Sequence, residues 1–142
     1  MLLREANIGG SAALCEMNRR SLGYDFPLED TKRRLAEVLA KPGNKIFVAE
    51  VNGRAVGYIH LADYDCICAE PMQNLLGFAV LPEYQKRGVG SALLSHAESW
   101  AKAQGFAGIR LNSGSGREEA HAFYIRKGYT LRKLQKHFVK YL

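Results

Sequence analysis

The chain has 142 residues, of which 47% are hydrophobic and 24% are charged, and this balance is typical of a globular protein. Its 20 basic residues outnumber its 14 acidic ones, and the formal net charge of +6 favours anionic partners. No apolar run approaches the ~20 residues of a membrane-spanning helix, and the N-terminus lacks the apolar core of a signal peptide. We therefore expect one cytoplasmic domain over residues 1–142 that does not bind a membrane.

The cysteines and the basic residues argue against two other classes of partner. Cys15, Cys66 and Cys68 cannot all pair, and no Cys-x-x-Cys motif occurs. Cys66 and Cys68 have no second pair of ligands near them, so packing suits them better than metal binding. The basic residues are scattered in pairs, for which a polyphosphate ligand accounts better than a nucleic acid. We expect no metal and no nucleic-acid partner.

The first half of the chain predicts one strand, two helices and two further strands. These elements are a strand over 2–6, helices over 12–22 and 28–40, and strands over 45–51 and 54–62. Ser11 is the expected N-cap of the first helix. Asn52-Gly53 is a strong signal for a two-residue hairpin between the two later strands. The acidic segment 63–72 is expected to be a loop.

A buried strand followed by a helix organises the second half. Residues 75–81 are almost wholly apolar, which suits a strand covered on both faces. Pro82 ends the strand because it has no N–H to donate. The remaining expected elements are a helix over 88–104, a strand over 109–112, a helix over 117–127 and strands over 129–131 and 136–141. This order predicts an α/β fold in three layers, with a mixed sheet between helices.

The turn before the helix at 88–104 predicts a site for phosphate. Gly88 and Gly90 permit close backbone approach, and a helix N-terminus offers unpaired N–H groups to an anion. Lys86 and Arg87 add two positive charges. The spacing matches no Walker A loop, and the dinucleotide fingerprint Gly-x-Gly-x-x-Gly/Ala fails at Leu93.

Two motifs resemble those of the GCN5-related N-acetyltransferase (GNAT) superfamily. Gln85-Lys86-Arg87-Gly88-Val89-Gly90, after a strand that ends in Val80-Leu81-Pro82, is similar to the family's coenzyme A pyrophosphate loop. The segment from Ala120 to Tyr129 is similar to the family's Ala-x-x-Phe-Tyr-x-x-x-Gly-Phe/Tyr segment. The resemblance covers essentially the whole chain. It implies four helices and a mixed, mostly antiparallel sheet of six to seven strands, in which the strands at 75–81 and 109–112 splay apart.

The resemblance also implies a reaction, the transfer of an acetyl group from acetyl-CoA to a primary amine by direct attack. It places acetyl-CoA on Phe78, Ala79, Val80, Gln85, Lys86, Arg87, Gly88, Val89, Gly90, Ser91, Asn112 and Arg117. In this reading residues 78–80 pair with pantetheine and an amide near Ala79–Val80 polarises the thioester carbonyl. Backbone amides of residues 85–91 hold the pyrophosphate. Tyr124 is the implied general acid that protonates the departing thiolate.

Two departures from the family pattern leave roles open. Many relatives have Asn where Arg117 stands, and Arg117 could bind a CoA phosphate or an anionic substrate. Many relatives also carry Glu on the central strand as a base, whereas this chain has Leu75, Leu76 and Gly77 there. The candidate bases are Glu70, Asp63, Asp65 and His60, or a chain of water molecules.

The resemblance implies a small-molecule or peptide amine as the acceptor, and we expect its site at the first two helices. Tyr24, Asp25 and Phe26 would contribute, together with the segment 63–70. The acidic residues Asp25, Asp63, Asp65 and Glu70 could attract a cationic amine. A non-catalytic acyl-CoA sensor and a nucleic-acid-binding module are the alternative functions. The expected last strand would leave a sheet edge free for a homodimer.

Overall fold

A computed structural model describes residues 1–142, which divide into two units, residues 1–111 and residues 112–142. The strands of the first unit are β1 (Leu2–Glu5), β2 (Asn44–Val51), β3 (Arg54–Tyr64), β4 (Met72–Val80) and β5 (Ile109–Arg110). Its helices are η1 (Ile8–Gly10), α1 (Ser11–Met17), η2 (Asn18–Leu22), α2 (Leu28–Ala40), η3 (Pro82–Tyr84) and α3 (Val89–Ala103). The second unit contains α4 (Glu118–Arg126).

The five strands form one mixed sheet in the order β1-β2-β3-β4-β5. Strands β1 to β4 pair antiparallel in sequence, and β5 pairs parallel to β4. The turn between β2 and β3 falls at Asn52-Gly53, with φ of 52° and 78°. Both residues are therefore left-handed, as a type I′ turn requires, and the predicted hairpin is confirmed.

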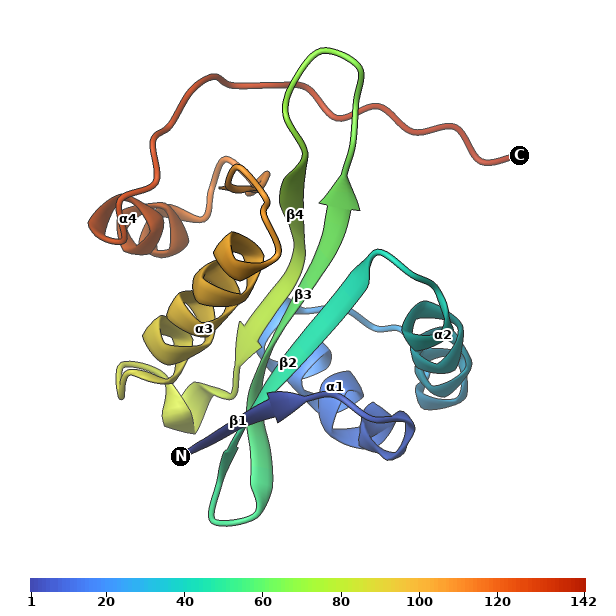
Figure 1. Ribbon diagram of the computed structural model, residues 1–142. Coiled ribbons are helices and arrows are strands. Elements are labelled where there is room, and N and C mark those ends of the chain that lie inside the picture. The colour runs from blue at the N-terminus through green and yellow to red at the C-terminus, as the bar shows by residue number, and fades with distance from the viewer. The chain divides into compact units, whose positions relative to one another are not determined.

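Helices cover both faces of the sheet in the first unit, so the predicted three layers are confirmed there. Figure 1 shows α1 and α2 on one side of the strands and α3 on the other. A Cβ added at Gly57 of β3 would lie 3.0 Å from Leu93 and 3.1 Å from Val89 of α3. Since side chains alternate along a strand, Tyr58 and His60 point to the opposite face, toward α1 and α2.

The core of the first unit lies on both faces of the central strands. Its most deeply buried apolar side chains are Met17, Val56, Ile59, Leu61, Leu81, Leu93 and Leu94. Each such side chain contributes about 1.5–3 kcal/mol through burial. This core therefore holds β3, β4 and α3 together.

The predicted strands over 129–131 and 136–141 are absent, so the sheet has five strands and not six to seven. Residues 130–142 are exposed along their whole length and belong to no ladder. Alternating apolar residues favour a strand, but a strand also needs a neighbour to accept its backbone hydrogen bonds. The sequence pattern alone could not supply that neighbour.

Several predicted boundaries also differ. The helix expected over 12–22 is split into α1 and the π-helical turn η2, and Gly10 takes the N-cap position expected of Ser11. The strand expected over 109–112 ends at Arg110. The acidic segment 63–72 is only in part a loop, because Asp63 pairs with Gln73 and Tyr64 pairs with Met72. Pairing between β3 and β4 thus extends the strand through Asp63, a residue of low strand propensity.

Candidate active site

Strand β4 has an open edge beyond its first residues. It pairs with β5 at two positions only, Gln73 with Ile109 and Asn74 with Arg110. On its other side, His60 pairs with Gly77 whereas Leu61 pairs with Leu75, so Leu76 is the extra residue of a β-bulge. A bulge bends a strand and redirects its groups. Pairing between the two parallel strands therefore ends before the bulge.

The main chain of Val80 shows which groups face this open edge. Its carbonyl oxygen accepts hydrogen bonds from Ser21 Oγ at 2.7 Å and from Gln85 Nε2 at 2.9 Å, on the side away from β3. Because main-chain groups alternate between the two edges of a strand, those of Phe78 face the same side. The edge therefore runs from the bulge to the loop that follows β4.

That loop ends in a helix N-terminus suited to an anion. Lys86 has φ of 60° and Gly88 has φ of 85°, and Gly88 is the N-cap of α3 without a side-chain cap. The amide of Ala92 bonds to Gly88 O at 3.0 Å. Consequently the amides of residues 89–91 have no acceptor within the helix and are available to a ligand. Arg87 lies beside them, with its guanidinium 5.5 Å from the ring of Tyr84.

Ion pairs neutralise the acidic residue at the start of the loop. Glu83 accepts hydrogen bonds from Arg20 at 2.7 and 3.1 Å, and Arg54 lies 3.6 Å away. Both arginines also pair with Glu16, at 3.0 and 3.1 Å. The hydrogen bonds from Arg20 lower the pKa of the Glu83 carboxyl below its ordinary value. Because Glu83 is the only acid between residues 82 and 91, the loop keeps a positive field.

A cavity of about 170 Å³ lies on the face of the sheet covered by α1 and α2. Its lining residues are Leu14, Asn18, Phe26, Thr31, Arg34, Leu35, Val38, Ile46, Tyr58 and His60. Two of them lie opposite the part of β4 that follows the bulge, because Tyr58 pairs with Ala79 and His60 pairs with Gly77. The cavity therefore borders the strand segment at which the resemblance puts the thioester.

The polar groups at the sheet end of the cavity are uncharged at neutral pH. The Tyr58 hydroxyl donates a hydrogen bond to Asn18 Oδ1 at 2.5 Å, and burial raises the pKa of Tyr58 to about 12. His60 Nε2 lies 3.0 Å from Asn44 Oδ1, and burial lowers the pKa of the imidazole. Since an amide oxygen only accepts, Nε2 carries the proton and Nδ1 remains as the ring's acceptor. Arg34 is the one charged side chain in the lining.

The second unit holds Tyr124 in a small aromatic cluster. Its ring centroid lies 5.5 Å from that of Phe123 and 5.7 Å from that of Tyr129. Burial raises the pKa of the Tyr124 phenol, and the nearby charge of Arg117 opposes this shift. Arg117 is exposed at the N-cap position of α4, and Asn112 is exposed as well. Tyr124 is therefore protonated at neutral pH and able to donate a proton.

The acidic residues expected at the acceptor site do not line the cavity. Asp25, Asp65 and Glu70 are exposed, and Asp63 Oδ1 accepts a hydrogen bond from Gln73 Nε2 at 2.7 Å. Of the four candidate bases, His60 alone lies in the lining. No local signal in the sequence pointed to Asn18, Arg34 and Tyr58. The signal for Tyr58 was its register opposite Ala79, which requires the strand pairing to be known.

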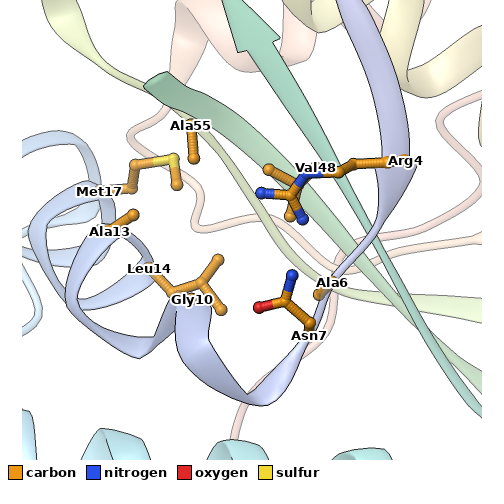
Figure 2. A pocket seen from close by; sticks show the side chains of 9 residues that line it. All are labelled: Arg4, Ala6, Asn7, Gly10, Ala13, Leu14, Met17, Val48 and Ala55. Atoms are coloured by element: carbon orange, nitrogen blue, oxygen red, sulfur yellow. The ribbon is translucent and has the colours of Figure 1, made fainter. Parts of the chain in front are cut away.

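A second hollow, shown in Figure 2, lies among β1, β2, β3 and α1. Its volume of about 10 Å³ is room for about one water molecule, so it is a packing space and not a substrate site. Arg4 at its rim is bound to Glu50 at 2.7 Å. No cluster of three or more His, Cys, Asp or Glu side chains lies where it could hold a metal ion. None of the helices combines the length and apolar character needed to cross a membrane.

Comparison with known proteins agrees with this geometry. The sequence model of the acetyltransferase (GNAT) family matches residues 11–129. The aminoalkylphosphonate N-acetyltransferase of Salmonella typhimurium is 30% identical over 128 residues, which cover 89% of this chain and 78% of that protein. The aminoglycoside N(6')-acetyltransferase type 1 of Stenotrophomonas maltophilia is 27% identical over 132 residues, which cover 89% of this chain and 84% of that protein.

Solved structures share the fold over the full length. A putative acetyltransferase from Agrobacterium tumefaciens superposes with a TM-score of 0.88 at 26% identity, covering 99% of this chain and 100% of that one. An aminoglycoside 6'-N-acetyltransferase from Acinetobacter haemolyticus gives a TM-score of 0.86 at 18% identity, covering 100% and 99% of the two chains, which shows a common fold.

The chain belongs to the acetyltransferase (GNAT) family. It is an acetyl-CoA-dependent N-acetyltransferase.

Proposed function

We propose that the protein transfers the acetyl group of acetyl-CoA to the primary amine of a small molecule by direct attack, through a tetrahedral intermediate. The observation that carries this proposal is the continuity between the open edge of β4 and the N-terminus of α3. An extended polar chain that ends in phosphates fits such a surface. The pantetheine arm and the pyrophosphate of acetyl-CoA together form such a chain.

The residues of the first unit suit each part of acetyl-CoA. The unpaired amides of residues 89–91 and the side chains of Lys86 and Arg87 would hold the pyrophosphate. Main-chain groups at the β4 edge near Phe78 would hydrogen-bond pantetheine, as a neighbouring strand would. We propose an amide at Ala79–Val80 as the donor to the thioester oxygen, where negative charge develops during attack.

The reaction requires a neutral amine, a proton acceptor and a proton donor. The amine nitrogen forms a bond to the carbonyl carbon, and collapse of the intermediate breaks the carbon–sulfur bond. We propose His60 Nδ1 as the acceptor of the proton that the amine loses, because the ring is neutral and lines the cavity. We propose Tyr124 as the donor to the thiolate. The phenol is protonated at neutral pH, as this role requires, and burial keeps its pKa above the ordinary value.

Two relatives support a small acceptor. The Salmonella relative is an N-acetyltransferase of aminoalkylphosphonates and the Stenotrophomonas relative one of aminoglycosides, and both kinds of compound are small amines. A cavity of about 170 Å³ suits a compound of the smaller kind. We therefore propose a small-molecule amine as the acceptor in preference to a peptide.

We also propose that both units act together as one cytoplasmic domain. The family match over residues 11–129 spans the boundary between them. The three cysteines are all free, which suits a reducing compartment.

The direct test is steady-state release of free CoA from acetyl-CoA in the presence of small primary amines. We expect amine-dependent release together with a product heavier by one acetyl group. Binding of acetyl-CoA without CoA release from any amine would instead identify a non-catalytic acyl-CoA sensor and overturn the proposal.

A further inference from the structure

We propose that the acceptor carries an acidic group in addition to its amine, and that Arg34 is the specificity-determining residue that binds this group. The inference rests on the proposed function, because it assigns the cavity bordered by Tyr58 and His60 to the acceptor. It replaces the expectation that acidic residues attract a cationic amine.

The first argument for this inference is the charge of the residues that line the cavity. Arg34 is the one charged residue among the ten that line the cavity, and the lining contains no carboxylate. A compound with several ammonium groups would find no carboxylate in the lining to bind them. A carboxylate or phosphonate group would instead meet the positive charge of Arg34.

The contacts of Arg34 leave donors for such a group. Its Nη1 bonds to Glu37 Oε2, and Glu37 is also shared with Arg33 at 3.4 Å and lies outside the lining. A guanidinium carries five N–H donors in a planar fork, so one bond to Glu37 does not exhaust it. The Arg34 side chain is 43% exposed and thus accessible to a ligand. Two parallel N–H donors would fit the oxygens of an acidic group.

The arrangement of the lining also orients the acceptor. Arg34 belongs to α2, whereas Tyr58 and His60 belong to β3 and lie opposite the part of β4 that follows the bulge. Apolar side chains of the same lining, Leu35, Val38 and Ile46, would contact a short carbon chain. An amine held with its acid at Arg34 would therefore direct its nitrogen toward β4. This geometry selects a compact amino acid analogue with the two groups at opposite ends.

The test compares CoA release from amines of similar size and different charge. The probes are 2-aminoethylphosphonate and β-alanine as acidic amines, n-propylamine as a neutral one and kanamycin as a polycation. We expect the acidic amines to have the lowest KM. Arg34→Gln should raise their KM about tenfold or more with little change for n-propylamine, since the lost bonds are charge-assisted. Arg34→Glu should remove acetylation of the acidic amines.

Arg33→Gln is the matched control, because Arg33 lies on the same helix and shares Glu37 but does not line the cavity. It should leave every KM within about twofold, and the melting temperature of each variant checks folding. A lower KM for kanamycin than for the acidic amines would overturn the inference while the acetyltransferase proposal stands. An equal change in the KM of the acidic amines in both arginine variants would do the same. Failure of every amine to release CoA would overturn the proposed function itself.

Discussion

Gly77 and Tyr58 are in such close contact that Gly77 has no room for a side chain, because an added Cβ would lie 2.7 Å from the Tyr58 hydroxyl oxygen. The glycine directly follows the bulge at Leu76, and the tyrosine lines the cavity. The fit thus couples the shape of β4 at the proposed thioester site to the wall of the proposed acceptor site.

Gly77→Ala should therefore displace Tyr58 and widen the bulge. We expect a loss of about 1–3 kcal/mol in the free energy of unfolding, as for overpacking in a core, together with reduced turnover. Gly116→Ala is the control, because nothing lies within 4 Å of a Cβ at Gly116 and its φ is not positive. Urea unfolding and CoA release measure both effects. Equal stability of the two variants would show that Tyr58 can move without cost.

Tyr58 gives a prediction at alkaline pH. Burial raises its pKa to about 12, above the value of 10.0 of a free phenol, so the folded state holds the proton more tightly. The resulting stability is present in full below pH 10 and is lost as the pH rises toward 12, at a cost of up to about 3 kcal/mol. Tyr58→Phe should be less stable than the wild type at pH 8, and the difference should shrink between pH 10 and pH 12. Urea midpoints across this range test it, and a constant difference would contradict the assignment.

Local signals in the sequence predicted much of the first unit. Asn52-Gly53 marked the hairpin because few residues adopt two successive left-handed conformations. Gly88 and Pro82 marked the junction of β4 and α3 for similarly local reasons. The acceptor cavity could not be predicted in this way. Arg34 sits on a helix face among other charged residues, and only strand register and helix packing bring it to the same cavity as Tyr58. The prediction of strands in the C-terminal segment was wrong for the same reason, because no neighbouring strand pairs with that segment.

Arg87 should contribute to acetyl-CoA affinity more than to stability. It is exposed, stacks on Tyr84 and adjoins the unpaired amides of α3. Arg87→Gln should raise the Kd for acetyl-CoA about tenfold and weaken its salt dependence, because one charge-assisted contact to phosphate is lost. Lys102→Gln, at the other end of α3, is the control and should leave the Kd unchanged. Calorimetric titration at two salt concentrations makes the measurement. Equal Kd values for both variants would remove Arg87 from the phosphate site.

Tyr124→Phe tests the proposed general acid. The substitution keeps the aromatic contacts with Phe123 and Tyr129 but removes the proton that the thiolate would take. We expect kcat to fall about 10²-fold or more, as for loss of a positioned acid, with little change in the Kd for acetyl-CoA. The control Tyr141→Phe, in the exposed C-terminal segment, should retain full activity. Unchanged kcat in Tyr124→Phe at every pH would assign the proton donor elsewhere.

The protonation of His60, which lines the acceptor cavity, should determine the acid side of the pH profile of kcat/KM. Burial places the pKa of its imidazole below the ordinary 6.5, so the ring is neutral at pH 7 with Nδ1 as its acceptor. Since the neutral form is favoured by folding, the associated stability is present above pH ~6.5 and is lost as the pH falls through the lower folded pKa. The acid limb of kcat/KM should accordingly lie below pH ~6.5.

His60→Gln should lower kcat and abolish that acid limb, while its amide can still donate to Asn44 Oδ1. His137→Gln, in the exposed C-terminal segment, should leave the profile unchanged. The profile of kcat/KM between pH 5 and pH 9 tests both variants, alongside their unfolding midpoints. If the acid limb survives in His60→Gln and only stability changes, His60 supports the cavity wall and the proton leaves the amine through water.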